Sequence, residues 1–169
     1  TTAVAALALA QFGGGRDALA GIGEGTARVG VLLPETRQRI NGRATTDGWV
    51  LNGSIELGYQ VPSSTHLMVQ FHTEDGDLMA VVEATRAGIE IDQFQGISYL
   101  EHAALAFENV AVSREDLVGA GRPAGEVAEV MRLLKLYVNS DLEKLAREGV
   151  KIRILGRRAG LPPDVAEIV

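Results

Sequence analysis

The first stretch of the sequence that could do chemistry lies between Gly21 and Gly25. It alternates glycine with Ile22 and Glu24, and glycine-rich loops let backbone N–H groups approach a phosphate. No parallel strand is predicted before this stretch, and Glu24 places a negative charge within it. We therefore interpret it as a plain linker rather than a phosphate-binding loop.

The histidine and cysteine residues are considered next as possible metal ligands. His66, His72 and His102 are too dispersed for the ligand spacing of a helix, and the chain has no cysteine. We expect no metal site and interpret the histidines as solvated residues of strands or loops. The missing cysteines also exclude a disulfide and a thiol nucleophile, and they fit a reducing compartment such as the cytoplasm.

Basic residues gather near the end of the sequence, at Lys151, Arg153, Arg157 and Arg158. Such a cluster could bind phosphate. On a strand, however, Lys151 and Arg153 would share one face, and charge on an exposed edge keeps a sheet from pairing with other chains. We favour this protective role. The whole chain carries 16 Lys and Arg against 22 Asp and Glu, a net charge of −6, so nucleic acid is not an expected partner.

The elements that must position these residues fall into two kinds. The 169 residues are 46% hydrophobic and 22% charged, which is typical of a globular protein. Short apolar or alternating runs between residues 26 and 120 predict strands near 29–33, 49–51, 67–71, 78–82, 88–91 and 104–107. The predicted turns between strands are Asn41-Gly42, Asp47-Gly48, Asn52-Gly53 and Asp75-Gly76. This spacing favours an antiparallel β barrel or sandwich.

Helical patterns flank the predicted strands. Residues 1–11 are rich in Ala and Leu and too short to span a bilayer. After Gly121 an apolar stripe at helical spacing predicts a helix, followed by a strand at 150–155 and a short helix from Leu161. The predicted fold class is therefore α+β, with a barrel or sandwich preceded by a short helix and followed by an α/β helix-strand-helix fragment.

The pattern divides the chain into residues 1–25, a helix and linker, residues 26–121, a β domain, and residues 122–169, an α/β fragment. We expect contacts to be self-contained on either side of Gly121. The apolar stripe should nevertheless be buried, either on the β domain or against a second copy of the chain, which leaves a homo-oligomer open.

The part through Gly121 resembles the acyl-CoA dehydrogenase family. Residues 46–53 match its strand-turn-strand signature D-G-x-x-L-x-G, and residues 107–112 match its strand before the third domain. The resemblance implies the end of an N-terminal helical domain, a middle β domain, and FAD and acyl-CoA as ligands. It places Glu35 in the loop that contacts FAD, where the family has T-E-P-x-x-G-S. Only Glu35 keeps this pattern within residues 33–38, so we expect little binding of FAD.

Residues 122–169 resemble the cis-prenyltransferases that make undecaprenyl diphosphate. The segment R-P-x-x-E-V begins at Arg122, and residues 148–156 match the later segment G-V-x-[IL]-x-[IV]-[IL]-G. The resemblance implies an isoprenyl diphosphate substrate held by Arg122 together with Glu126. The apolar tunnel positions carried over from the family are Val130, Leu133 and Leu134. The family's magnesium-binding aspartate has no counterpart here, so magnesium is not expected.

Together the two resemblances predict a chimera, natural or artificial. The favoured function is an incomplete acyl-CoA dehydrogenase-like module fused to a prenyltransferase-like segment, without catalysis of its own because the catalytic groups of both families are missing. Two alternatives stay open. One is a fragment of an isoprenyl diphosphate transferase, and the other is an artificial or structural protein with no activity.

Overall fold

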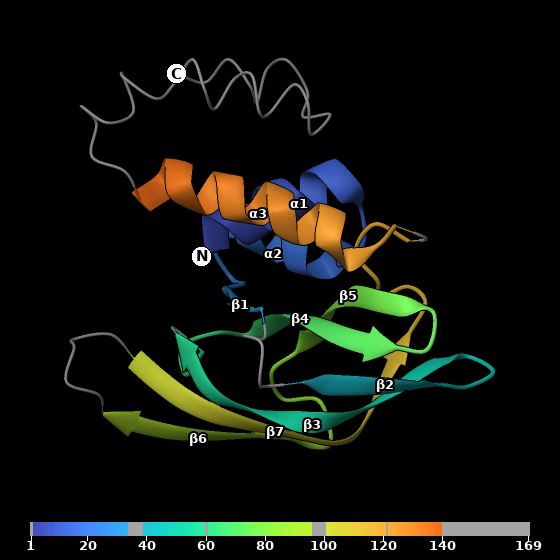
Figure 1. Cartoon of the computed structure of the whole chain (residues 1–169). Helices are drawn as coiled ribbons and strands as arrows, with labels where there is room; N and C mark the ends of the chain where they lie inside the picture. Colours follow the sequence, from blue (N-terminus) through green and yellow to red (C-terminus); the bar gives the residue numbers. More distant parts are fainter. Residues whose placement is uncertain (1, 34–38, 60, 96–100, 121, 140–169) are drawn as a thin grey trace.

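A computed structural model describes residues 2–33, 39–59, 61–95, 101–120 and 122–139 of the chain (Figure 1). Within these residues, two helices precede seven strands, and a third helix follows them. Their bounds are α1 (Thr2–Phe12), α2 (Arg16–Glu24), β1 (Val29–Leu32), β2 (Ile40–Ala44), β3 (Gly48–Tyr59), β4 (His66–Thr73), β5 (Gly76–Glu83), β6 (Ile89–Gln95), β7 (Glu101–Ser113) and α3 (Ala124–Asn139).

The strands form one mixed sheet in the order β1-β4-β2-β3-β7-β6, with β5 paired to β4. The pairs β2–β3, β3–β7, β6–β7 and β4–β5 are antiparallel, whereas β1 and β2 each run parallel to β4. The α+β class is confirmed. The sheet of the described residues is mixed rather than wholly antiparallel, and it does not close into a barrel.

The helices lie together on one side of the sheet, over β1, β4 and β5 (Figure 1). One apolar cluster lies on the inner face of the folded sheet and includes Leu51, Phe71 and Phe107. A second cluster joins the helices to the sheet, and Leu9 and Met79 belong to it. No described helix is both long and apolar enough to cross a membrane.

The apolar face of helix α3 packs against elements that precede Gly121 in the sequence. Val127, Val130 and Met131 are buried in the cluster that also contains residues of α1 and β5. The predicted burial of the stripe on this chain is confirmed for these three residues; the side chains from 133 onward lie outside the described residues. The expectation of self-contained contacts is wrong for α3. Helix α1 has no charged residue, so it requires cover on two sides, by the sheet and by α3.

Two predicted turns join strands, and two lie inside them. Asp47-Gly48 ends the β2–β3 connection, and Asp75-Gly76 ends the connection from β4 to β5. Asn41-Gly42 instead lies within β2, where a Cβ on Gly42 would come 2.4 Å from the Phe71 ring. Asn52-Gly53 lies within β3 at an irregularity in its pairing with β7.

A second helix occupies much of the predicted linker. Residues 16–24 form α2, which begins after Gly15 and ends at Gly25. The glycines at 21 and 23 therefore belong to a helix, and the flanking glycines in the left-handed conformation set its limits. The strand predicted at 150–155 and the helix predicted from Leu161 lie outside the described residues.

Candidate functional site

Two of the residues predicted to bind substrate meet at the start of α3. Arg122 Nη1 donates a hydrogen bond to Glu126 Oε2 over 3.2 Å, and the Arg122 guanidinium carbon lies 5.7 Å from the ring centroid of Phe12. Both charged side chains are exposed. An ion pair of this kind between exposed residues contributes little to stability. The arrangement fixes Arg122 between α1 and α3 and leaves it open to water.

The structure does not place the other predicted binding residues in an open site beside Arg122 and Glu126. Val130 is 3% exposed and packs in the cluster between α3, α1 and the sheet. The backbone of Leu133 and Leu134 belongs to α3, but their side chains are not described. The whole of Glu35 lies outside the described residues. The substrate-binding roles of these residues stay predictions.

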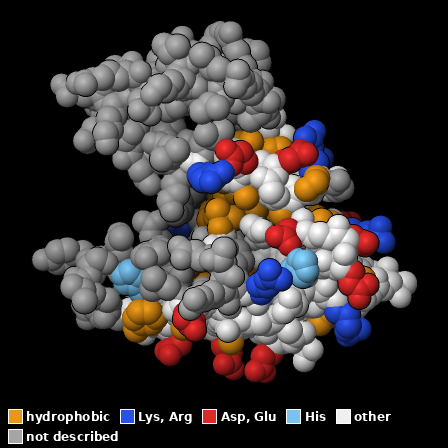
Figure 2. Space-filling view, viewed as in Figure 1, with side chains coloured by type: hydrophobic (Ala, Val, Ile, Leu, Met, Phe, Trp, Pro, Cys, Tyr) orange, Lys and Arg blue, Asp and Glu red, His pale blue; other side chains and the backbone are white. Residues whose placement is uncertain are grey.

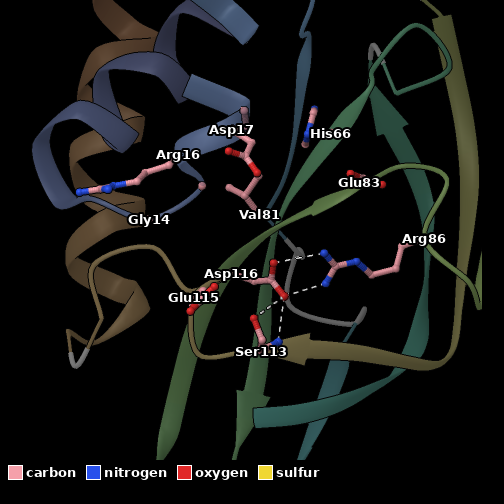
Figure 3. Close-up of a pocket in the computed structure, with 12 residues that line it drawn as sticks. Gly14, Arg16, Asp17, His66, Val81, Glu83, Arg86, Ser113, Glu115 and Asp116 are labelled. Atoms are coloured by element: carbon pink, nitrogen blue, oxygen red, sulfur yellow. Dashed lines mark hydrogen bonds and ion pairs between the residues drawn. The ribbon is translucent and has the colours of Figure 1, made fainter. Parts of the chain in front are cut away.

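A pocket that the sequence did not predict lies between the helices and the sheet. It has a volume of about 540 Å³. One wall is the start of α2, and the facing walls come from β5, from the turn after it and from the segment after β7 (Figure 3). The lining residues are Gly14, Gly15, Arg16, Asp17, Ala18, His66, Val81, Glu83, Arg86, Ser113, Glu115 and Asp116.

An ion pair between Arg86 and Asp116 forms one wall of the pocket (Figure 3). Arg86 donates from Nη1 to Asp116 Oδ2 over 2.7 Å and from Nη2 to Oδ1 over 3.2 Å. The backbone N–H and the hydroxyl of Ser113 also donate to Asp116 Oδ2. Two parallel bonds between a guanidinium and a carboxylate give strong and directional pairing.

The surroundings of Asp116 shift its titration. Burial raises the pKa of this carboxyl. The hydrogen bonds from Arg86 and Ser113 and the positive charge of Arg86 lower it by more than burial raises it, so the pKa of Asp116 is below its ordinary value. Asp116 is therefore ionised at neutral pH, and Ser113 has its hydroxyl committed to that carboxylate. Ser113 thus lacks the free base that would activate a serine nucleophile.

Backbone contacts hold the same wall in place. Val81 N–H donates to Asp116 O, and Val118 N–H donates to Met79 O, each over 2.8 Å. Gly14 lies against this segment so closely that a Cβ there would come 2.1 Å from Leu117 O. The glycines at 13–15, which the sequence explained only as the end of a helix, therefore also let the α1–α2 connection approach the sheet.

The remaining charges of the pocket are mostly negative. Asp17, Glu83 and Glu115 make no ion pair within the described residues. The Arg16 side chain points away from the pair formed by Arg86 and Asp116 (Figure 3). A dinucleotide cofactor brings a negatively charged pyrophosphate, which three unpaired carboxylates would repel. The pocket therefore does not fit FAD.

A second polar cluster lies on β4 and β5. His72 Nδ1 is 2.7 Å from Asp77 Oδ1, and Gln70 Nε2 donates to Asp77 Oδ2 over 2.8 Å. The hydrogen bond with His72 is the largest influence on Asp77 and holds the pKa of that carboxyl below its ordinary value. This pairing orients the imidazole as in a base-and-orienter pair, but the cluster is half exposed and lies away from the pocket.

Metal binding has no support from the described part of the chain. Within it, no group of three or more His, Cys, Asp or Glu side chains is placed to hold a metal ion. His66 and His72 lie at the two ends of β4, where His66 borders the pocket and His72 pairs with Asp77. His102 lies on β7, stacks on Phe94 and is buried, so the expectation of a solvated histidine is wrong for it.

Sequence reasoning missed the residues that build the pocket. Arg86 and Asp116 are 30 positions apart, and neither belongs to a periodic or motif-like pattern. Only the fold brings the turn after β5 to the segment after β7, so no local signal could have found the pair.

Comparison with curated proteins finds similarity to isoprenyl transferases over part of the chain. The isoprenyl transferase of Caulobacter vibrioides is 43% identical over 90 residues, which are 53% of this chain and 31% of that protein. The isoprenyl transferase of Agrobacterium fabrum is 38% identical over 88 residues, 52% of this chain and 32% of that protein. The matches thus span about a third of each relative. They exceed the 48 residues from 122 to 169, so they extend upstream of Arg122.

Comparison with solved structures finds the fold of acyl-CoA dehydrogenases. A Mycobacterium smegmatis glutaryl-CoA dehydrogenase in complex with FADH2 superposes with a TM-score of 0.66 at 16% identity, over 76% of this chain and 38% of that one. The Tcur3481–Tcur3483 steroid ACAD G363A variant gives a TM-score of 0.67 at 27% identity, over 78% and 38%. The ChsE4–ChsE5 complex of Mycobacterium tuberculosis gives 0.68 at 20% identity, over 78% and 36%.

No family model matches the chain. Both resemblances that the sequence predicted are nevertheless confirmed, one by sequence similarity to isoprenyl transferases and one by fold similarity to acyl-CoA dehydrogenases. Their presence together is consistent with a chimera.

Proposed function

We propose that the chain is an incomplete acyl-CoA dehydrogenase-like module, joined to an isoprenyl transferase-like segment, that does not catalyse a reaction on its own. The fold similarity carries this proposal. It covers more than three quarters of this chain but only 36–38% of the similar dehydrogenase chains. The parts of a dehydrogenase site that this sequence does not cover would have to be supplied from outside it, and we propose a cytoplasmic location for the module.

The chemistry of the described residues supports a binding role over a catalytic one. The pocket contains a carboxylate already paired with a guanidinium and a serine already bonded to that carboxylate. No described hydrogen bond joins Ser113 to a base other than this paired carboxylate, so the serine is not activated as a nucleophile. If FAD were bound by the complete assembly, it would supply the redox chemistry, and Glu35 is the residue of this chain that the family resemblance places beside it.

An assay of acyl-CoA oxidation tests this proposal. The purified chain is incubated with FAD, a series of acyl-CoA thioesters of different lengths and an artificial electron acceptor. We expect no reduction of the acceptor above the rate with FAD alone. A rate that rises in proportion to the concentration of the chain, and that is lost when the chain is heat-denatured, would contradict the proposal.

A second candidate function is the binding of an isoprenyl diphosphate near α3. The 43% identity to an isoprenyl transferase and the exposed guanidinium of Arg122 favour it. Ionisation of an allylic diphosphate requires a metal ion or several cations to stabilise the leaving group. Arg122 already pairs with Glu126, so this chain would bind such a substrate without converting it.

Titration with farnesyl diphosphate, with and without magnesium, separates the two functions. Arg132→Ala is the matched control for Arg122→Ala, because Arg132 is also exposed and paired with a glutamate of α3. Saturable binding that Arg122→Ala abolishes and Arg132→Ala preserves would establish the second function. Absence of binding in all three proteins would remove the second function and leave the non-catalytic dehydrogenase-like module and the structural or artificial protein.

A further inference from the structure

The outer face of β3, β7 and β6 is the face turned away from the apolar cluster around Leu51 and Phe107. Glu90 and Asp92 of β6 lie opposite Ala106 and Ala104 of β7, and Ala106 lies opposite Ser54 of β3. Residues opposite one another in antiparallel strands point to the same side of a sheet. The intervening residues of these strands, such as Ile91 and Leu105, face the core. No described helix covers this outer face, because all three lie over β1, β4 and β5 (Figure 1).

Carboxylates surround a floor of small residues on this outer face. Glu56, Glu90, Asp92 and Glu108 are exposed, and none of them forms an ion pair within the described residues. Acidic side chains line the lower edge of the molecule in Figure 2, where Figure 1 places these strands. The residues opposite Glu90 and Asp92 are Ala106 and Ala104, so neither carboxylate faces a cation on β7.

An exposed aromatic residue lies on the same face. Phe94 follows Glu90 and Asp92 in alternation, and it lies opposite His102 in the register of β6 and β7. Phe94 is 41% exposed and is one of two large hydrophobic residues that are exposed among those described. The Phe94 ring stacks on His102 with centroids 5.9 Å apart. An aromatic side chain held rigidly at the surface is typical of the anchor of an interface.

We propose that the outer face of β3, β7 and β6 docks an arginine-bearing segment of a partner protein. Strands lie about 4.8 Å apart, so the carboxylates of β6 and β3 stand about 10 Å apart across β7. A chain lying along Ala104 and Ala106 reaches both rows with its side chains. Arginine fits because its guanidinium pairs with two carboxylate oxygens and also stacks on an aromatic ring.

Charge complementarity selects this occupant over the others. A second copy presenting the same face would set Glu90 and Asp92 against identical carboxylates, and nucleic acid or an anionic membrane would be repelled in the same way. This inference does not depend on the dehydrogenase-like function, because it concerns a surface separate from the pocket and from Arg122.

A peptide titration tests the docking face. The probe is a fluorescein-labelled peptide of five Arg-Ser repeats, measured by fluorescence anisotropy at low salt, with Gly-Ser repeats as the uncharged reference. We expect saturable binding with a dissociation constant below about 100 μM. The variant Glu90→Gln/Asp92→Asn should weaken binding about tenfold, and Phe94→Ser should weaken it about threefold.

The matched control is Glu74→Gln/Asp75→Asn at the β4–β5 turn, which removes the same charge from exposed residues elsewhere. It should change the affinity less than about twofold. Far-UV circular dichroism checks that every variant is folded. Equal loss in both double variants would show attraction by net charge alone and would overturn the proposal, as would the absence of wild-type binding. A dimer in sedimentation velocity that Phe94→Ser abolishes would assign the face to a second copy instead.

Discussion

Two parts of the outer face of the sheet, which is turned away from the cluster around Phe71 and Phe107, differ in their cover. The helices lie over one part, the covered side, and no described helix lies over the other, the open side (Figure 1). On the covered side, Met79 and Val81 are buried with residues of α1 and α3, and Arg86 pairs with Asp116. On the open side, Glu90 and Asp92 have no partner of opposite charge among the described residues. The covered side thus contains charges that pair within the chain, and the open side is the surface on which we propose that a partner docks.

The largest effect is expected from a charge placed in the covered side. Val130→Asp would bury an unpaired carboxylate in the cluster of α1, α3 and β5, which destabilises a fold by about 3–5 kcal/mol. Thermal melting measures this loss. Ala10→Asp on the exposed side of α1 is the control and should change the melting temperature little. Equal melting of both variants would mean that α3 does not pack on the helical layer.

A smaller loss is expected when the ion pair of the covered side is broken. Arg86→Met keeps an aliphatic side chain but leaves Asp116, which is 18% exposed, without its guanidinium partner. Removal of a hydrogen-bonded charge at such a site destabilises by about 1–3 kcal/mol. Urea denaturation at neutral pH measures the change. A midpoint unchanged from that of the wild type would contradict the role of this pair in holding the segment after β7.

The same ion pair predicts how stability depends on pH. The pKa of Asp116 is lower in the fold than its ordinary value of about 4. Its stabilising contribution is therefore complete above the unfolded pKa and is lost as the pH falls through the folded pKa. Melting temperatures measured between neutral pH and about pH 2 should fall less steeply in acid for Asp116→Asn than for the wild type. Parallel curves would remove Asp116 from the explanation of acid sensitivity.

A substitution on the open side should increase stability rather than reduce it, and it should have the smallest effect of the four. Glu90→Gln removes one of the clustered carboxylates, so it should raise the stability of the isolated chain by less than about 1 kcal/mol at low salt, because exposed charges interact weakly. High salt should reduce this gain because it screens the repulsion. Urea midpoints at two salt concentrations measure the effect. A destabilised variant would mean that Glu90 has a favourable partner on this face.

The elements of the fold were more predictable from the sequence than the candidate site. Asp47-Gly48 and Asp75-Gly76 lie between apolar runs, so their local chemistry marks the connections between strands. Strand β2 was missed because Asn41-Gly42 has the composition of a turn, whereas Gly42 makes room for the Phe71 ring of another strand. This glycine is explained by a long-range contact, which the local composition of the sequence does not reveal.

Most of the candidate site depends on long-range contacts, and the exception is the pair Arg122–Glu126. Arg122 lies two residues before α3 and Glu126 lies in its first turn, so the two are close in sequence. Arg86 and Asp116 meet only because β5, β6 and β7 fold back on one another. The burial of Val130 likewise depends on α1, more than a hundred residues earlier in the chain.

Titration of FAD with the purified chain, followed by quenching of the flavin fluorescence, tests most directly whether this dehydrogenase-like module lacks a cofactor site of its own. The family pattern that contacts FAD is reduced to Glu35, and the pocket presents unpaired carboxylates to an anionic cofactor. We predict no saturable quenching up to about 100 μM FAD. A dissociation constant in the micromolar range, about −8 kcal/mol of binding free energy, would contradict the account and identify the chain as a flavin-binding module.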